Sequence, residues 1–558
     1  MAMMTGWQAV VKALKAEGIR IVYGLPGNPK DLYDALYDET SIKAVQVRHE
    51  AAGGFMAMMH ALSTGEPAVC YASQGPGLAN LTPAMLEALA TCAPVIALAA
   101  GGDGHTDGMG AFQETDQMGI MNPVSKWTHR VPYAEKIPWV LHRAFSLATT
   151  GQPGPVYIEI PVEVGRGRWE ISEYVPALRT LRTAGDPRLI SKASDLILHS
   201  QRPVIVAGGG TRNSRAHDEL KMLAELLGMP VMSTPSGRGS IEEDHPLSFG
   251  QVGLYRNSLG MKAFAEADLL ITVGSRNEEF QSGAWKLFPK GAKFIQVDIE
   301  LFEISRNWVP DLPVVGDAKL VLSAILDSLR DHATPEWEKR KKKYSEAKRA
   351  YETEVAEECR KCNDMPLKSK RIVYEINQVF GRNTIMVHEN GCQDLWTYYS
   401  PYYRVLERDA DIAPGEQTCM GSGVAGAVGV KLAHPEKNVV CVTGDGAFQM
   451  YNQDVPTAVQ YNAPVTWVIL NGFSLGWPKL TQKELGGRYI ATDFTTQPDF
   501  AQMAKAYGCQ GERVDRPEEI RGALERALQA NESGKSAILD CIIDPDDVSE
   551  GFEAYRNL

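Results

Sequence analysis

The chain has 558 residues, of which 44% are hydrophobic and 23% charged, and its formal net charge is −12. This length predicts about three domains of ordinary globular composition. The negative charge argues against a nucleic-acid partner, because binding to phosphate backbones needs a basic surface. No apolar run reaches the roughly 18 residues of a membrane span, and Lys12, Lys15 and Glu17 interrupt any signal peptide. The nine cysteines are scattered and odd in number, which is typical of a reduced, cytoplasmic protein.

Short β-branched runs alternate with longer helical patterns from the N-terminus onward. The first four runs are residues 19–27, 43–50, 67–77 and 94–102. Buried parallel strands have this nearly continuous apolar character, and a turn and a helix follow them. The fold class expected is therefore α/β, with doubly wound parallel sheets.

The pattern restarts at residues 202–210 and again near Ile372, so we expect three such sheets. The expected parts are an N-terminal domain at residues 1–180, a central domain at 190–335, a charged helical linker at 336–370 and a C-terminal domain at 371–548.

Two oxygen-bearing side chains end successive strands of the expected C-terminal domain. Asp445 lies between Gly444 and Gly446 after one apolar run, and Asn471 ends the next. Ligands of open α/β sheets bind at the carboxyl ends of strands, so we expect these side chains to lie side by side. Mg²⁺ prefers such oxygen ligands, and the glycines would let backbone amides approach a diphosphate. A plain tight turn is the alternative for a lone Gly-Asp-Gly, but its pairing with Asn471 favours a metal–diphosphate site.

The segment GDGAFQMYNQDVPTAVQYNAPVTWVILNG resembles the diphosphate–metal motif of thiamine-diphosphate-dependent enzymes. The resemblance implies that the Asp445 and Asn471 side chains and the Phe473 carbonyl hold Mg²⁺. Gly472 stands where many members have a second Asn, which is not usually a metal ligand. The motif implies further cofactor contacts from the rest of its two strand-end loops, namely Gly444, Gly446, Ala447, Ser474 and Leu475.

Glu50 closes the run KAVQVRHE and precedes a helix of small residues. A helix N-terminal acid stabilised by the helix dipole is the simpler interpretation. The resemblance instead implies the activating glutamate, which shares a proton with the aminopyrimidine ring of the cofactor so that the thiazolium C2 carbanion forms.

Three further motifs extend the resemblance. GPGLAN resembles the family's GPGxxN turn, which supplies Gly75 and Asn80 to the cofactor site. AFQETDQ, residues 111–117, resembles the acetohydroxyacid synthase and benzaldehyde lyase group, in which Gln113 would face the substrate; a polar surface loop is the alternative. In CMGSGVAGAVG, Met420 would wedge the cofactor into its bent shape, and the preceding carbonyl of Thr418 would accept a hydrogen bond from it. Core filling is the alternative for Met420.

Two candidate catalytic residues come from position alone. Asn28 and Pro29 stand where some relatives carry catalytic histidines. Glu484 lies after Asn471, with Lys483 and Arg488, in a segment where relatives place specificity residues. This segment is either a mobile cover over the site or a surface helix.

The central domain resembles one that binds FAD, ADP or part of coenzyme A in some relatives, while many relatives bind nothing there. The glycines of residues 207–210 would suit a phosphate, and Asp298 at a strand end would suit a ribose or an adenine.

The resemblance covers nearly the whole chain and is closest to the acetohydroxyacid synthase-like branch. It implies a thiamine-diphosphate- and Mg²⁺-dependent carboligase or lyase, similar to acetolactate synthase, which acts on a 2-oxo acid or an aldehyde through an acyl-anion intermediate. A 2-hydroxyacyl-CoA lyase or an oxalyl-CoA decarboxylase-like enzyme is the first alternative. An FAD-dependent oxidoreductase similar to pyruvate oxidase is the second, and a non-catalytic partner subunit is the third.

The resemblance also implies an assembly, because Glu50 of one subunit would act on a cofactor held by Asp445 of another. We expect a homodimer at minimum and a homotetramer, with a small-molecule substrate and neither nucleic acid nor membrane as a partner.

Overall fold

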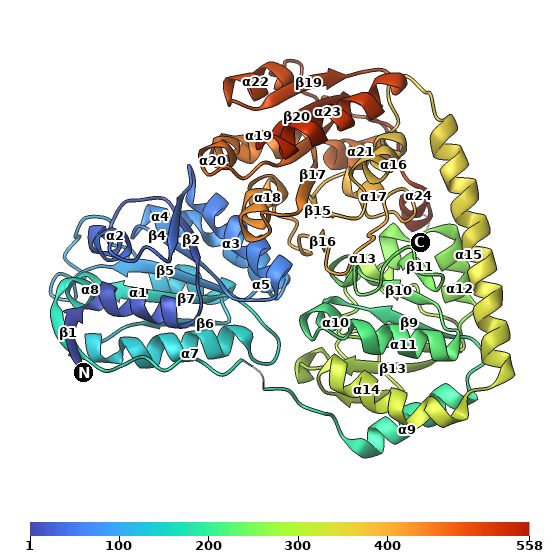
Figure 1. The fold of residues 1–558 in the computed structure, drawn as a ribbon, viewed down its shortest axis with the longest axis horizontal. Helices are drawn as coiled ribbons and strands as arrows, with labels where there is room; N and C mark the ends of the chain where they lie inside the picture. The colour runs from blue at the N-terminus through green and yellow to red at the C-terminus, as the bar shows by residue number, and fades with distance from the viewer. Residues whose placement is uncertain (180, 557–558) are drawn as a thin grey trace. The chain divides into compact units, whose positions relative to one another are not determined.

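The computed structural model describes residues 1–179 and 181–556 (Figure 1). Thr180, the last residue expected in the N-terminal domain, lies outside the described residues. The chain divides into two compact units that are both discontinuous in sequence. The first holds residues 1–181, Pro414–Glu436 and Ala447–Val465; the second holds Arg182–Ala413, Lys437–Gly446 and the residues from Thr466 onward.

The first unit is built on a parallel sheet with the strand order β3-β2-β4-β5-β7-β6. The inner strands β4 and β5 are buried along their whole length, because helices cover both faces of the sheet. Helices α1, α2 and α7 pack on one face, and α3 and α5 lie on the other (Figure 1). The strands are β2 (Ile21–Gly24), β3 (Lys43–Gln46), β4 (Ala68–Ala72), β5 (Val95–Gly101), β6 (Trp127–Arg130) and β7 (Val156–Pro161). The helices are α1 (Gly6–Ala16), α2 (Lys30–Tyr37), α3 (Glu50–Thr64), α4 (Pro76–Asn80), α5 (Thr82–Ala90), α6 (Gln117–Met121), α7 (Ile137–Thr149) and α8 (Val162–Arg166), and β1 (Ala2–Thr5) pairs antiparallel with β8 (Arg168–Ile171).

Two later helices, α18 (Ser422–Ala433) and α20 (Val455–Gln460), complete the first unit. A Cβ atom added to Gly429 of α18 would lie 2.2 Å from the carbonyl oxygen of Met56 in α3. A Cβ atom on Gly426 would instead lie 2.1 Å from the Met59 sulfur. The glycines of α18 therefore allow its backbone to approach α3 closely.

The second unit contains two parallel sheets. The central sheet has the order β11-β10-β9-β12-β13-β14. Its strands are β9 (Pro203–Ala207), β10 (Val231–Ser233), β11 (Ser248–Gln251), β12 (Leu269–Val273), β13 (Lys293–Asp298) and β14 (Leu312–Val315). Its helices are α9 (Pro187–His199), α10 (Gly209–Asn213), α11 (His217–Leu227), α12 (Ser258–Ala265), α13 (Glu279–Ser282) and α14 (Ala318–Leu329). The charged segment that follows forms one long helix, α15 (Pro335–Lys361).

The C-terminal sheet has the order β16-β15-β17-β18-β20-β19 and is also parallel. Its strands are β15 (Thr384–His388), β16 (Asp411–Ile412), β17 (Asn438–Gly444), β18 (Thr466–Asn471), β19 (Gln510–Val514) and β20 (Ala537–Ile542). Its helices are α16 (Ser369–Phe380), α17 (Asp394–Thr397), α19 (Asp445–Tyr451), α21 (Gly476–Glu484), α22 (Phe500–Ala506), α23 (Ile520–Glu532) and α24 (Glu550–Arg556). The predicted fold class, three parallel-sheet α/β domains, is confirmed.

Within the described ranges, no helix combines the length and the apolar character needed to cross a membrane.

We expect Gly429→Ala to destabilise the first unit by about 1–3 kcal/mol, because the new methyl group would meet backbone that cannot move aside. Alanine is the better helix former by only about 1 kcal/mol, which does not offset this collision. Gly426→Ala is the matched control, since its methyl group meets the flexible end of Met59. The measurement is the apparent melting temperature, and a Gly429→Ala protein that melts at or above Gly426→Ala would contradict the expectation.

Candidate active site

Glu50 begins helix α3 and is held against the 75–80 turn. Its side chain is 7% exposed, and its Oε2 accepts a hydrogen bond of 2.9 Å from Nδ2 of Asn80. A Cβ atom on Gly77 would lie 3.0 Å from Glu50 Oε1, so this residue must be small for the turn to lie against the carboxylate. The parallel sheet explains the proximity, because Glu50 follows β3 and the turn follows β4 at the same edge.

The loop that contains Gln113 packs against Gly75 of the 75–80 turn. Gly75 has a φ of +67°, and a Cβ atom there would lie 2.7 Å from the Gln113 carbonyl oxygen. Gln113 itself has a φ of +59°, which is uncommon for a residue with a side chain and is found at functional sites. The structure therefore brings four of the predicted residues into one neighbourhood: Glu50, Gly75, Asn80 and Gln113.

Gln117, which sequence reasoning left without a role, links this turn to the sheet. Its Oε1 accepts from the Gly75 amide at 2.8 Å, and its Nε2 donates to Glu159 Oε2 at 3.0 Å. Burial raises the pKa of Glu159, whose other oxygen forms an ion pair of 2.9 Å with Arg130. The sequence signal was only the second glutamine of AFQETDQ.

Asn28 lies in the exposed loop between β2 and α2. Among the described residues, no hydrogen bond joins it to Glu50 or Gln113. Its catalytic role stays a prediction.

Asp445 and Asn471 lie side by side in the second unit. Gly444 of β17 pairs with Leu470 of β18, so the two side chains follow at the same level of neighbouring strands. Asp445 is 3% exposed, and burial raises its pKa to about 6 despite hydrogen bonds from Gln497 and from the backbone amides of Gly446 and Ser474. A bound divalent cation would favour the charged form of this carboxyl group.

Asn471 has a fixed amide orientation. Its Nδ2 donates to Asp540 Oδ1 at 2.8 Å, and an ionised carboxylate can only accept, so the assignment of nitrogen and oxygen follows. The Asn471 Oδ1 accordingly accepts from the Phe473 amide at 3.2 Å. Asp540 is itself fully buried and paired with Arg513. This arrangement directs the amide oxygen toward the strand-end loop, as a metal ligand requires.

The loops around Asp445 have spare hydrogen-bonding groups. A Cβ atom on Gly444 would lie 2.9 Å from Gln393 Oε1, and the buried Gln393 Nε2 has no hydrogen-bond partner in the described structure. The buried Oε1 of Gln497 is likewise unsatisfied, while its Nε2 donates to Asp445. A donor beside Gly444 and oxygen atoms beside Asp445 fit a diphosphate and a hard cation. Neither glutamine was anticipated from the sequence.

The other predicted residues of this site follow the same loops. Gly446 and Ala447 continue α19, and a Cβ atom on Gly446 would meet the Leu475 side chain at 2.7 Å. Phe473 has a φ of +53° and Ser474 is buried. In the first unit, Thr418 has a φ of +50°, and Met420 is half-buried just before α18.

Glu484 ends helix α21, whose first residue follows Leu475 directly. The Glu484 carboxylate forms an ion pair of 2.5 Å with Arg556 of α24, and Lys483 pairs with Asp546 at 2.9 Å. Trp477 of α21 also makes an edge-on ring contact of 5.3 Å with Phe552. Helix α21 is thus tied to the end of the chain, and its role as a cover stays a prediction.

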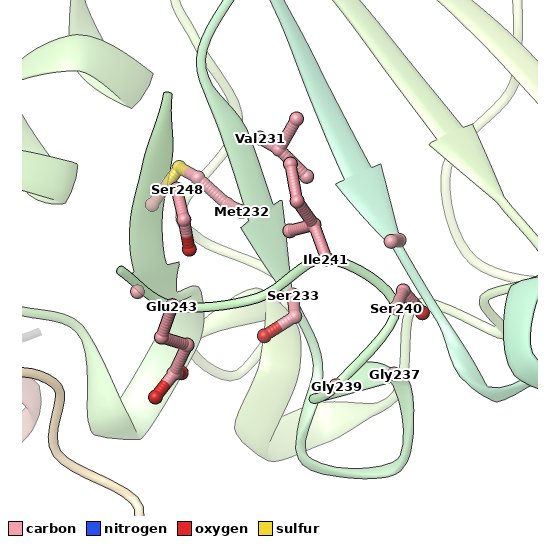
Figure 2. Close-up of a pocket in the computed structure, with 11 residues that line it drawn as sticks. Val231, Met232, Ser233, Gly237, Gly239, Ser240, Ile241, Glu243 and Ser248 are labelled. Atoms are coloured by element: carbon pink, nitrogen blue, oxygen red, sulfur yellow. The ribbon is translucent and has the colours of Figure 1, made fainter. Parts of the chain in front are cut away.

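The central-domain glycines are explained by packing. Cβ atoms on Gly208 and Gly237 would lie 2.1 Å and 2.0 Å from the carbonyl oxygens of Gly274 and Ala207, so the strand-end loops interlock. Figure 2 shows residues that line a small cavity at this edge of the sheet, among them Gly237, Ser240 and Glu243; its volume is about 10 Å³. That space holds about one water molecule and does not admit a nucleotide.

Asp298 remains the polar candidate at this edge of the central sheet. Burial raises its pKa to about 6, with Glu303 and Arg276 nearby. Binding of FAD, ADP or coenzyme A stays a prediction.

We expect Asp540→Ala to lower the affinity for Mg²⁺ about 10–100-fold in the presence of thiamine diphosphate, because the Asn471 amide loses its orientation. Asp540→Asn keeps one acceptor oxygen and should lose less. The affinity is measured by titration calorimetry, with the exposed Asp515→Ala as control. Unchanged Mg²⁺ affinity in a folded Asp540→Ala protein would remove the orienting role.

Comparisons with known proteins bear on both units. Residues 4–120 match the N-terminal TPP-binding domain of thiamine pyrophosphate enzymes, residues 190–325 their central domain and residues 389–541 their C-terminal TPP-binding domain. A probable acetolactate synthase large subunit of Methanocaldococcus jannaschii is 36% identical, over 97% of this chain and 92% of that protein. One of Methanococcus aeolicus is 34% identical over the same shares, and an acetolactate synthase of Mycobacterium bovis is 31% identical over 97% and 88%. The chain therefore belongs to the thiamine pyrophosphate enzymes, in their acetolactate synthase-like branch.

Proposed function

We propose that the protein is a Mg²⁺- and thiamine-diphosphate-dependent carboligase that joins the acyl part of one 2-oxo acid to a second carbonyl compound, with loss of CO₂. The observation that carries this proposal is the buried Glu50 carboxylate, held by Asn80 in a chain similar over nearly its whole length to acetolactate synthases. Thiamine diphosphate, when bound, supplies the carbon nucleophile and electron sink for bond changes next to a carbonyl.

The residues divide the work as follows. Glu50 would exchange a proton with the aminopyrimidine through its carboxylate, which the Asn80 amide orients. Asp445, Asn471 and the Phe473 carbonyl would hold Mg²⁺. The Gln393 Nε2 would donate to the diphosphate, since it is buried without a partner in the described structure. In this scheme Gln113 orients the substrate.

The names of the similar proteins favour a 2-oxo acid over a coenzyme A thioester, an aldehyde or an FAD-linked oxidation. We place the enzyme in the cytoplasm, because all nine cysteines are free thiols in the described structure. We also propose that the smallest active assembly is a homodimer and that the full assembly is a homotetramer.

The first experiment adds thiamine diphosphate and Mg²⁺ to the purified protein and follows pyruvate consumption, CO₂ and acetolactate. Glu50→Gln should bind thiamine diphosphate yet lose at least about 100-fold in turnover and in exchange of the cofactor C2 proton, because the proton acceptor is gone. The exposed Glu173→Gln is the control. Normal proton exchange in Glu50→Gln, or no reaction of the wild type with pyruvate or other 2-oxo acids, would refute the proposal.

Gln113→Ala should lower kcat/KM about 10–100-fold, which is the effect of losing one hydrogen bond to a buried or charged group. The dissociation constant of thiamine diphosphate should stay unchanged, because the Gln113 atoms nearest to Gly75 of the turn are its backbone and Cβ atoms, which alanine keeps. Steady-state kinetics and calorimetry measure the two quantities. The reverse pattern would place Gln113 away from the substrate.

A further inference from the structure

Glu87 is a fully buried carboxylate with no role in the proposed reaction. It lies on α5, and its two oxygens accept hydrogen bonds from two backbone amides of one loop. The Gly415 amide donates to Oε1 at 2.6 Å and the Cys419 amide to Oε2 at 2.7 Å. Burial raises the pKa of Glu87, and the two amides offset part of the cost of burying the charge.

The loop between these two amides has little freedom. A Cβ atom on Gly415 would lie 2.9 Å from Glu87 Oε1, so the approach of the carboxylate requires glycine. The Thr418 amide donates to the Gly415 carbonyl at 3.1 Å, which closes a turn within the loop that Glu87 holds. Thr418 has a φ of +50°, a left-handed conformation that a residue with a side chain keeps only when the surrounding structure holds it there.

This loop, residues 415–419, carries the carbonyl of Thr418, and Met420 follows it directly. The helix that carries Glu87 follows α4 almost immediately, and α4 carries Asn80, the partner of Glu50. One short stretch, residues 75–90, therefore holds both the glutamate turn and this loop.

We propose that Glu87 is a positioning residue that fixes the 415–419 loop, and with it the Thr418 carbonyl and Met420, in the geometry the cofactor needs. The inference rests on the proposed function, because Thr418 and Met420 have those roles only with thiamine diphosphate bound. Glu87 itself touches neither substrate nor cofactor in this proposal.

The test compares the full-length wild type with Glu87→Gln, which keeps the shape of the side chain but turns an amide group against one backbone N–H. Glu17→Gln is the matched control, since Glu17 is also buried and accepts from the Ala177 amide at 2.7 Å, in the same unit but on other elements. The first readout is hydrogen–deuterium exchange of a peptide spanning residues 413–421, measured without cofactor. We expect exchange there to rise about tenfold in Glu87→Gln, as for the loss of one charge-assisted hydrogen bond, and to stay unchanged in Glu17→Gln.

The second readout is the dissociation constant of thiamine diphosphate with Mg²⁺, which we expect to rise about tenfold in Glu87→Gln but not in Glu17→Gln. If Glu87→Gln does not fold, Gly415→Ala disturbs the same contact through the loop. It should likewise raise both the exchange of the 413–421 peptide and the dissociation constant of thiamine diphosphate. Wild-type exchange and wild-type affinity in either folded variant would overturn the inference. If Glu87→Gln shows faster exchange but unchanged affinity for thiamine diphosphate, Glu87 has a purely structural role and the positioning role is overturned. Failure of the wild type itself to bind thiamine diphosphate would instead refute the proposed function.

Discussion

Parallel pairing of every strand in the three six-stranded sheets is the constraint on which the site depends. A crossover must return the chain to the starting end of the sheet, so all carboxyl ends meet at one edge. Residues far apart in sequence are thereby placed together without any local signal between them. In the first unit this edge gathers the loops that follow β3, β4 and β5, and in the C-terminal sheet it gathers those that follow β15, β17 and β18.

Glu50 and Asn471 are buried at these edges, and each has a hydrogen-bond partner inside the protein that offsets the cost of burial. Asn80 is the partner of Glu50, and Asp540, itself paired with Arg513, is the partner of Asn471. Buried polar pairs also link the two sheets of the second unit. Arg238 is fully buried and paired with Glu243 at 2.8 Å, and it approaches Asp411 of β16 to 3.6 Å. Asp411 in turn accepts from His388 at 2.6 Å, the residue just before the loop with Gln393.

The sequence sufficed for the residues that end strands, because strand periodicity and parallel topology locate them together. The pairing of Gly444 with Leu470 gives the neighbouring positions expected of Asp445 and Asn471. The orienting residues Asp540 and Glu87 were missed, because their partners are distant in the chain: Glu87 meets Gly415, and the only local hint is one acidic residue in an apolar helix.

Glycine was the least informative residue type. The sequence does not distinguish a glycine that admits a ligand from one that admits neighbouring backbone, and Gly208 and Gly237 are of the second kind. The roles proposed for Asn28 and Glu484 rest on position within the family resemblance and stay predictions: Asn28 lies in an exposed loop, and Glu484 forms an ion pair with Arg556.

The close fit of α18 on α3 has a consequence for synthesis of the protein. Helix α3 is complete at Thr64, but the glycine-rich helix that covers it begins only at Ser422. Ribosomes add about 5–20 residues per second, so roughly 360 residues of intervening chain correspond to an interval of about 20–70 s. During that interval the Met56 and Met59 surface of the nascent first unit lacks its own cover. The window in which this chain needs protection from aggregation is therefore set by the order of its segments rather than by the stability of the finished fold.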